Sequence, residues 1–187
     1  MARCVLIETD RLKLRGWQDC DREPFASINR DPEVMRYLGP LLSLADSNAS
    51  IEEQTALMAS GEPAFWAVEH KSSEQLIGCI GVKRVSFNAP FTPSYEIGWR
   101  LCRAYWGQGY ASEGAQAALK LAFEKWDIDK IHSFTVHANL ASQAVMEKIG
   151  MKRIIDGNFK HPKLAQDDPL SGHILYLITR AEFNTVT

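Results

Sequence analysis

The chain has 187 residues, of which 45% are hydrophobic, and its 21 basic and 23 acidic side chains give a formal net charge of -2. This length suits one well-packed domain and is short for two. The near-neutral charge, without a block of lysine and arginine, argues against a nucleic-acid partner. No apolar stretch is long enough to cross a bilayer, so we expect no membrane association. A single domain over residues 1–187 is the simplest expectation.

The cysteines are widely scattered and form none of the C-x-x-C pairs that bind zinc or act in redox exchange. They are Cys4, Cys20, Cys79 and Cys102. This pattern predicts reduced thiols in a cytoplasmic protein. Glu8 and Asp10 near the N-terminus argue against a secretory signal. His132 and His137 are five residues apart on a predicted strand and should point to opposite faces, so we expect no metal site.

The N-terminal third predicts one strand followed by helices. Residues 5–15 alternate between apolar and basic side chains, as in a half-buried strand. Asp19 or Asp21 can cap a helix, and Asp31-Pro32-Glu33 opens a second, short helix that stops at Gly39-Pro40. A third helix should begin near Ser47 or Ser50, because Ser50 and Glu53 have capping-box spacing.

The remaining two thirds alternate between strands and helices. We expect strands over residues 65–69, 76–82, 95–101, 131–136, 151–155 and 173–179, helices over 115–126 and 142–149, and a long surface loop over 158–172. The first two of these strands form a hairpin. This order predicts a mixed sheet in one α/β domain.

The most informative segment is Arg103–Gly114, which places two glycines between a strand and a helix. Gly107 and Gly109 allow a tight turn and close approach of the backbone to a ligand. The first amides of the following helix have no partners inside the helix and favour an anion. The alternative is a turn that binds nothing.

Two nucleotide-binding motifs are excluded by spacing. A dinucleotide fingerprint that starts at Gly107 needs glycine or alanine where Ser112 stands. No triphosphate-binding run of the form G-x-x-x-x-G-K-[ST] occurs anywhere in the chain. The anion is therefore of another kind.

The chain resembles the GCN5-related N-acetyltransferases (GNAT), and within them the branch that acetylates the N-termini of ribosomal proteins. The glycine loop is similar to the pyrophosphate motif Q/R-x-x-G-x-G/A, with Gly109 and Ala111 at its small positions and Trp106 where Gln or Arg usually stands. Residues 8–15, 95–99, 139–142 and 147–151 resemble further segments of this branch, in the same order.

The resemblance implies a single-domain α/β fold with a mixed, mostly antiparallel sheet flanked by helices. Its fourth and fifth strands splay apart, and coenzyme A lies in the gap. Acetyl-CoA is then the cosubstrate, and the backbone near Ile97 to Trp99 contacts the thioester oxygen. The residues implied in cofactor binding are Trp99, Leu101, Trp106, Gly107, Gln108, Gly109, Tyr110, Ala111, Ser112 and Asn139.

Acetyl transfer from a thioester to an amine needs a base, a stabilised oxyanion and a protonated leaving thiolate. Glu96 is the candidate base, with a surface or ion-paired glutamate as the alternative. The resemblance makes Ser142 a candidate acid, whereas its alternative role is a helix N-cap. Many family members carry a tyrosine four residues further on, where this chain has Met146. Asn139 has a loop-to-helix turn as its alternative role, and His137 is more typical of a strand-end surface residue.

The sequence leaves the acceptor open. Phe65, Trp66, Phe87 and Phe91 could line an acceptor groove, although Phe65 and Trp66 are more typical of a core and Phe91 is the better candidate. The acceptor is an amine, either a protein N-terminus or a small amine such as a polyamine or an antibiotic. A non-catalytic coenzyme A-binding sensor is the alternative of a different class. A homodimer is possible for any of these.

Overall fold

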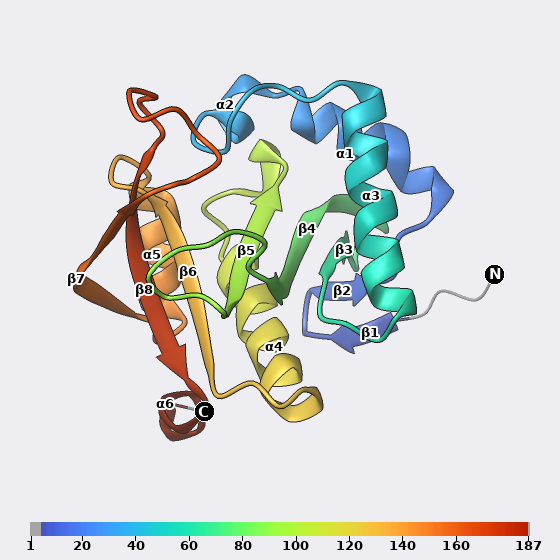
Figure 1. Ribbon diagram of the computed structural model, residues 1–187. Helices are drawn as coiled ribbons and strands as arrows, with labels where there is room; N and C mark the ends of the chain where they lie inside the picture. The colour runs from blue at the N-terminus through green and yellow to red at the C-terminus, as the bar shows by residue number, and fades with distance from the viewer. Residues whose placement is uncertain (1–4, 187) are drawn as a thin grey trace.

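Eight strands form one sheet in the order β1-β2-β3-β4-β5-β6-β8-β7 (Figure 1). The computed structural model describes residues 5–186. All neighbouring strands are antiparallel except β5 and β6, which are parallel. The strands are β1 (Val5–Glu8), β2 (Leu12–Arg15), β3 (Phe65–His70), β4 (Gln75–Arg84), β5 (Tyr95–Leu101), β6 (Lys130–Val136), β7 (Lys152–Lys160) and β8 (Gly172–Thr179). The predicted α/β fold with a mixed, mostly antiparallel sheet is confirmed.

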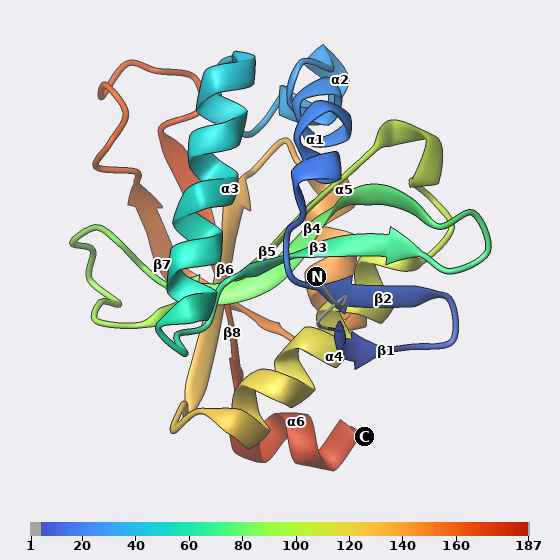
Figure 2. The same ribbon diagram turned by 90° about the vertical axis from the view of Figure 1, so that its right-hand side faces the viewer.

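Helices cover both faces of this sheet. In Figure 2, α1 and α3 lie on one side of strands β2–β4 and α4 lies on the other. The helices are α1 (Arg22–Asn29), α2 (Pro32–Met35), α3 (Leu44–Ala59), α4 (Tyr110–Lys125), α5 (Leu140–Lys148) and α6 (Arg180–Val186), with short 3-10 turns η1 (Asp19–Asp21) and η2 (Arg103–Tyr105). The C-terminal helix α6 was not expected from the sequence.

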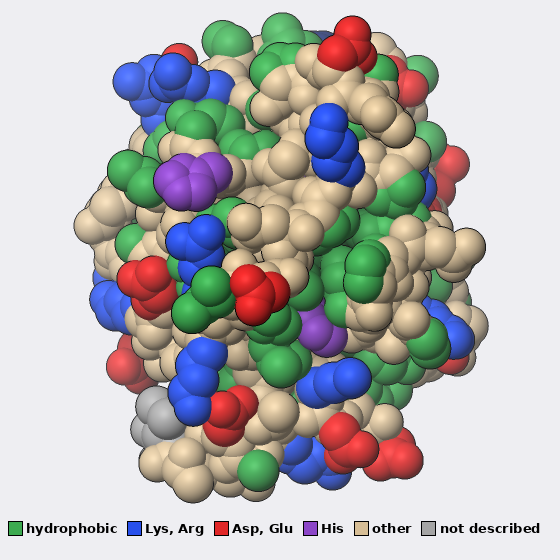
Figure 3. All heavy atoms as spheres, turned by 60° about the vertical axis from the view of Figure 1, so that its left-hand side comes forward, with side chains coloured by type: hydrophobic (Ala, Val, Ile, Leu, Met, Phe, Trp, Pro, Cys, Tyr) green, Lys and Arg blue, Asp and Glu red, His purple; other side chains and the backbone are tan. Residues whose placement is uncertain are grey.

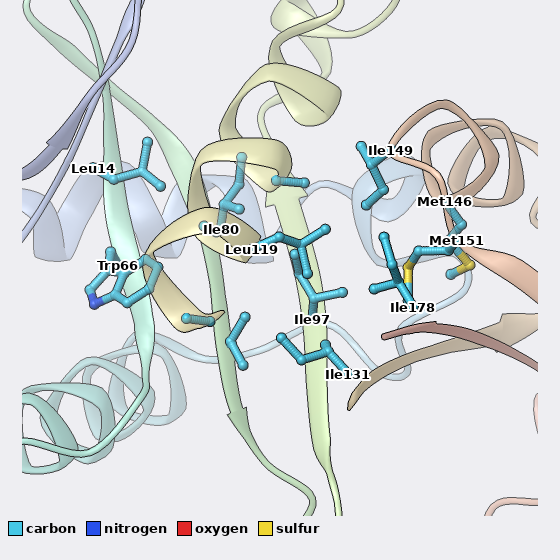
Figure 4. Close-up of a cluster of buried hydrophobic side chains, with 14 of the residues drawn as sticks. Leu14, Trp66, Ile80, Ile97, Leu119, Ile131, Met146, Ile149, Met151 and Ile178 are labelled. Atoms are coloured by element: carbon cyan, nitrogen blue, oxygen red, sulfur yellow. The ribbon is translucent and has the colours of Figure 1, made fainter. Parts of the chain in front are cut away.

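The main core lies between the sheet and α4, whose small side chains allow close packing (Figure 4). Ala115, Ala118 and Ala122 are all fully buried on this helix. Gly114 lies directly against the sheet, because a Cβ at this position would come within 2.5 Å of Ile80 Cδ1. The apolar stripe in the sequence therefore marks the helix face that holds α4 against β4 and β5.

The first predicted strand is a hairpin rather than one continuous strand. The amide of Thr9 donates to the carbonyl of Leu12 at 3.0 Å, and β1 pairs with β2 in antiparallel fashion. The Thr9 hydroxyl accepts from the Leu12 amide at 2.9 Å. A polar turn of three residues thus interrupts the alternating pattern, and hydrophobic periodicity alone does not reveal it.

Three other predicted boundaries are wrong. Helix α3 begins at Leu44 rather than near Ser47 or Ser50, because Ser43 and Asp46 form the capping box. Helix α2 ends at Met35, although Asp31 caps it as predicted. Strand β7 extends to Lys160, so the surface loop is shorter than expected. Cys20, Cys79 and Cys102 are free thiols, and Cys4 lies outside the described residues.

A buried ion cluster joins the N-terminal hairpin to β3 and η1. The Arg15 guanidinium donates to Asp21 Oδ2 at 2.7 Å and Oδ1 at 2.9 Å, and to Glu69 Oε2 at 2.8 Å. All three residues are at most 3% exposed. Asp21 therefore does not cap α1 with its side chain, which was one of the two predicted caps. The carboxylate holds Arg15 instead.

Replacing Arg15 with leucine should lower the free energy of unfolding by about 3–5 kcal/mol, because the buried carboxylates of Asp21 and Glu69 both lose the guanidinium. Lys13 Nζ remains 3.7 Å from Glu69 Oε1. Urea denaturation at pH 7 measures this loss. The matched control is Arg22→Leu, which breaks exposed pairs with Asp19 and Glu52 and should cost at most about 1 kcal/mol. Equal losses in the two variants would contradict a structural role for the buried cluster.

Candidate active site

The site begins where the parallel strands β5 and β6 separate. Only two residue pairs join them, Tyr95 with Ile131 and Glu96 with His132. Beyond these pairs the Ser133 hydroxyl donates to the carbonyl of Ile97 at 3.0 Å. The splayed strands implied by the resemblance are therefore present, and they open a gap in the middle of the sheet.

A cavity of about 340 Å³ lies at this gap and extends beneath α1 and α3. Strand β5 contributes every residue from Glu96 to Arg100 to its lining. Other lining residues come from β3, β4, β6, β8, α1, α3, α5 and the loop over residues 161–171. The cavity is thus assembled from segments that are far apart in the sequence.

Glu96 lies in this cavity with its side chain 16% exposed. Burial raises the pKa of Glu96 from 4.5 to about 7, although the positive charges of Lys83 and Lys163 oppose the shift. Lys83 Nζ is 3.9 Å from Glu96 Oε1. A carboxylate with this pKa can take up and release a proton near neutral pH.

Ser142 and Asn139 both line the cavity at the start of α5. Asn139 is the N-cap, and its Oδ1 accepts from the Ser142 amide at 3.2 Å. The alternative reading of Ser142 as the N-cap is therefore wrong. Asn139 Nδ2 also donates to the hydroxyl oxygens of Thr135 and Ser142, each at 3.0 Å. Asn139 thus fixes the Ser142 side chain at the cavity wall.

The glycine loop leads from η2 into α4 as the sequence predicted. Gly107 and Gly109 have φ angles of 72° and 83°, in the left-handed region that favours glycine. Gly109 is the N-cap of α4 and supplies no side-chain cap to the first amides of the helix. These amides are therefore available to an anion.

The loop side chains lie differently from one another. Tyr110 and Ser112 are buried, so only their backbone amides could meet a ligand at this turn. Trp106 is 44% exposed, and its Nε1 donates to the carbonyl of Leu101 at 2.8 Å. Gln108 is exposed, whereas Ala111 packs partly against the core.

Arg11 and Lys148 flank this loop, and the sequence did not single out either residue. A Cβ at Gly109 would lie 3.4 Å from Arg11 Nη2 and 4.0 Å from Lys148 Nζ. Arg11 Nη1 donates to the carbonyl of Gln108 at 2.9 Å, and its Nε donates to Glu113 Oε2 at 2.7 Å. The start of α4 therefore combines amide donors with two nearby cations.

The two predicted cofactor-binding side chains on β5 differ in whether they line the cavity. Trp99 is partly buried and lines the cavity. Leu101 is 4% exposed, belongs to the core cluster and is not among the residues that line the cavity. Its assignment as a cofactor contact stays a prediction, as does that of the other cofactor-binding residues.

The aromatic residues divide between the core and the cavity. Trp66 is 2% exposed and stacks on Trp126, whereas Phe65 lines the cavity. Phe87 and Phe91 pack with Phe134, and of these three only Phe134 is a lining residue. Phe134 was not predicted, because nothing in its strand pattern separates it from a core phenylalanine.

His132 and His137, for which no metal-binding role is expected, differ in burial. His137 is exposed just after β6. His132 is 3% exposed, its Nδ1 is 2.6 Å from the Ser94 hydroxyl, and burial lowers its pKa to about 4. Within residues 5–186, no cluster of three potential metal-ligating side chains occurs.

The molecular surface carries charges of both signs. On the face drawn in Figure 3, lysine and arginine side chains are interspersed with acidic and hydrophobic ones. In the described part of the chain, none of the helices has the length and apolar character required to span a membrane.

Comparison with known sequences identifies relatives whose names specify acetyl transfer. The chain is 31% identical over 155 residues to the uncharacterized N-acetyltransferase YnaD of Bacillus subtilis, covering 82% of this chain and 85% of that protein. It is 29% identical over 186 residues to the FsC-acetyl coenzyme A-N(2)-transacetylase of Aspergillus fumigatus, covering 95% and 77%. Both alignments include most of each chain.

Comparison with solved structures shows the same fold. The ribosomal L7/L12 alpha-N-protein acetyltransferase RimL, solved with coenzyme A, superposes with a TM-score of 0.76 at 16% identity, covering 94% of this chain and 97% of that one. The family model for the acetyltransferase (GNAT) domain matches residues 11–152. The chain therefore belongs to the GNAT family of acetyl-CoA-dependent N-acetyltransferases.

Proposed function

We propose that this enzyme transfers an acetyl group directly from acetyl-CoA to a primary amine, with Glu96 as the general base. The observation that carries the proposal is a carboxylate of pKa about 7 in the cavity beside the divergence of β5 and β6. An amine attacks a thioester only after it has lost a proton, and a base with this pKa removes protons efficiently near neutral pH. The bound acetyl-CoA supplies the acetyl thioester.

The residues at the start of α4 fit the pyrophosphate of acetyl-CoA. The amides from Gly107 to Ser112 provide donors for its oxygens, whereas the predicted amide of Trp106 already donates to the carbonyl of Arg103 at 3.1 Å. The helix dipole adds a favourable field. Lys148 lies beside Gly109 and adds positive charge, whereas the charge of Arg11 on the same side is paired with Glu113. We assign the donor to this loop and to the gap that it leads into.

The backbone of β5 is suited to hold the thioester oxygen. The Ile97 carbonyl faces β6, where it accepts from Ser133. The N–H and C=O groups of successive residues point to alternate sides of a strand. Those of Trp99 therefore point to the same side as the Ile97 carbonyl, into the gap beyond the last β5–β6 pair, Glu96 with His132. Ser142 also lines the cavity, and in this proposal its hydroxyl protonates the departing thiolate.

The acceptor has two candidate classes. A protein N-terminal α-amine follows from the resemblance to the ribosomal-protein branch, and the cavity of about 340 Å³ reaches residues of α1 and α3. A small amine is the second candidate, supported by the fungal relative whose name specifies an N(2)-transacetylase. A panel of N-terminal peptides and small amines, followed by release of free coenzyme A thiol, distinguishes them.

Replacing Glu96 with glutamine should lower amine-dependent turnover by about 10²- to 10⁴-fold, because the base is lost. Coenzyme A affinity should not change. The buried charge disappears in this variant, so its stability above pH 7 should equal or exceed that of the wild type. Glu124→Gln, on the exposed face of α4, is the matched control. Unchanged turnover in Glu96→Gln would contradict the proposed base, and binding without thiol release in the wild type would favour a sensor.

The rate should rise with pH through about 7, because Glu96 must be ionised to accept a proton. Replacing Lys83 with methionine removes a charge that lowers this pKa, so the acidic limb of kcat/KM should move to higher pH. The pH profiles of the two proteins with one acceptor measure the shift, since the acceptor's own titration is common to both. Lys120→Met, which removes an exposed lysine of α4, should leave the profile in place.

Replacing Gly109 with valine should weaken coenzyme A binding at least tenfold, because a β-branched residue resists a φ of 83° and its side chain would approach Arg11. Calorimetric titration with coenzyme A measures the change. Gly61→Val is the matched control, since Gly61 has a φ of 80° and a Cβ there would meet nothing within 4 Å. If both variants bind coenzyme A like the wild type, the pyrophosphate assignment is wrong.

A further inference from the structure

Arg100 lines the same cavity as Glu96 and lies on the same face of β5. The two residues are four positions apart, and side chains alternate along a strand, so both project from one side of the sheet. Gly98 lies between them and has no side chain. Four residues of strand span about 13 Å, which sets the separation of the two backbone positions.

Buried neighbours hold the guanidinium of Arg100 in place. Its Nη1 donates to Asn29 Oδ1 at 2.6 Å, and Asn29 Nδ2 donates to the Ser47 hydroxyl at 3.0 Å. Asn29 and Ser47 are both fully buried. The Phe25 ring lies 5.9 Å from the guanidinium carbon. Helices α1 and α3 thus position Arg100 at the cavity wall.

The hydrogen-bonding capacity of this guanidinium is not met within the protein. Arg100 Nε is buried and has no hydrogen-bond partner among residues 5–186, and no carboxylate in this range forms an ion pair with Arg100. Arg15 is also buried, but two carboxylates pair with it. A desolvated donor without a partner is costly. Nε itself is enclosed, so a carboxylate in the cavity would meet the terminal nitrogens of this planar guanidinium, which suit a carboxylate.

We propose that Arg100 binds a carboxylate carried by the acceptor whose amine is placed at Glu96. This inference rests on the proposed function, since it takes Glu96 to mark the amine position. The acceptor is then an amine and a carboxylate joined by a spacer. Two kinds of molecule carry an amine and a carboxylate in this way: a peptide with an acidic residue near its N-terminus, and a small amino acid with a long chain.

The surface between the two charged positions indicates what the spacer is like. The Phe65 ring lies across Gly98, with its Cζ 3.2 Å from a Cβ built there, and the largely buried Cys79 pairs with Arg100 on the neighbouring strand. This surface is mostly apolar and suits a spacer without charge.

The test compares acceptors that differ only in this carboxylate. The peptide pairs are Ala-Glu-Ala-amide with Ala-Gln-Ala-amide, and Ala-Ala-Glu-amide with Ala-Ala-Gln-amide. The small-molecule pair is ε-aminocaproate with its amide. For each pair, kcat/KM comes from thiol release, and affinity comes from calorimetric titration of the enzyme saturated with coenzyme A.

We expect the wild type to prefer the acidic member of at least one pair by about 10- to 100-fold, the range for a charged hydrogen bond. Whether that pair is a peptide or the small acid identifies the source. In Arg100→Gln the preference should fall to about one, whereas Arg100→Lys should retain part of it. Arg153→Gln, on the exposed strand β7, is the matched control and should keep the wild-type preference.

The two readouts separate the possible failures. Equal binding of the acid and amide members by the wild type, no binding of any probe, or a preference that survives in Arg100→Gln would overturn the role of Arg100. Carboxylate-dependent binding without thiol release would leave Arg100 supported and the proposed function wrong. Thermal melting of each variant detects a loss of folding, and a misfolded Arg100→Gln protein leaves the wild-type and Arg100→Lys comparison as the deciding measurement.

Discussion

The separation of β5 from β6 is the constraint on which the rest of the site depends. A sheet interrupted in its middle leaves backbone groups without partners, and buried groups of this kind must be satisfied. Side chains satisfy two of them, since Ser133 donates to the carbonyl of Ile97 and Trp106 Nε1 donates to that of Leu101. The peptide groups of Trp99 lie between these two positions. The gap is therefore closed at both ends by protein donors, and its centre is where we propose that the cosubstrate binds.

The same chemistry serves stability in one part of the molecule and reactivity in another. Arg15, Asp21 and Glu69 are buried together, and their charges are mutually paired at hydrogen-bond distance. Glu96 is also largely buried, but its cation Lys83 is 3.9 Å away and burial outweighs the attraction. The pKa near neutrality results from this incomplete pairing. A closer lysine would stabilise the carboxylate and make it a weaker base.

The parts of the fold that the sequence predicted correctly are those encoded locally. Gly107 and Gly109 precede an apolar helix stripe within one short segment, so the loop and α4 could be inferred together. The start of α3 was predicted wrongly because two nearby pairs, Ser43 with Asp46 and Ser50 with Glu53, both have capping-box spacing. The structure uses Ser43 and Asp46, and Ser50 lies inside the helix. At α5, Asn139 and Ser142 are both residue types that favour the N-cap, and Asn139 occupies it.

The donor and acceptor halves of the site differ in how they are built. In the proposed function, backbone amides at the start of α4 and along β5 bind the donor, and such contacts depend on chain geometry more than on side-chain identity. The proposed acceptor half uses side chains from several elements. Asn29 of α1 accepts from Arg100, and Asn29 in turn donates to Ser47 of α3. Changes at these positions can alter the accepted amine while the donor site stays intact. The family motif therefore identifies the donor, and the acceptor emerges only when the tertiary structure brings these side chains together.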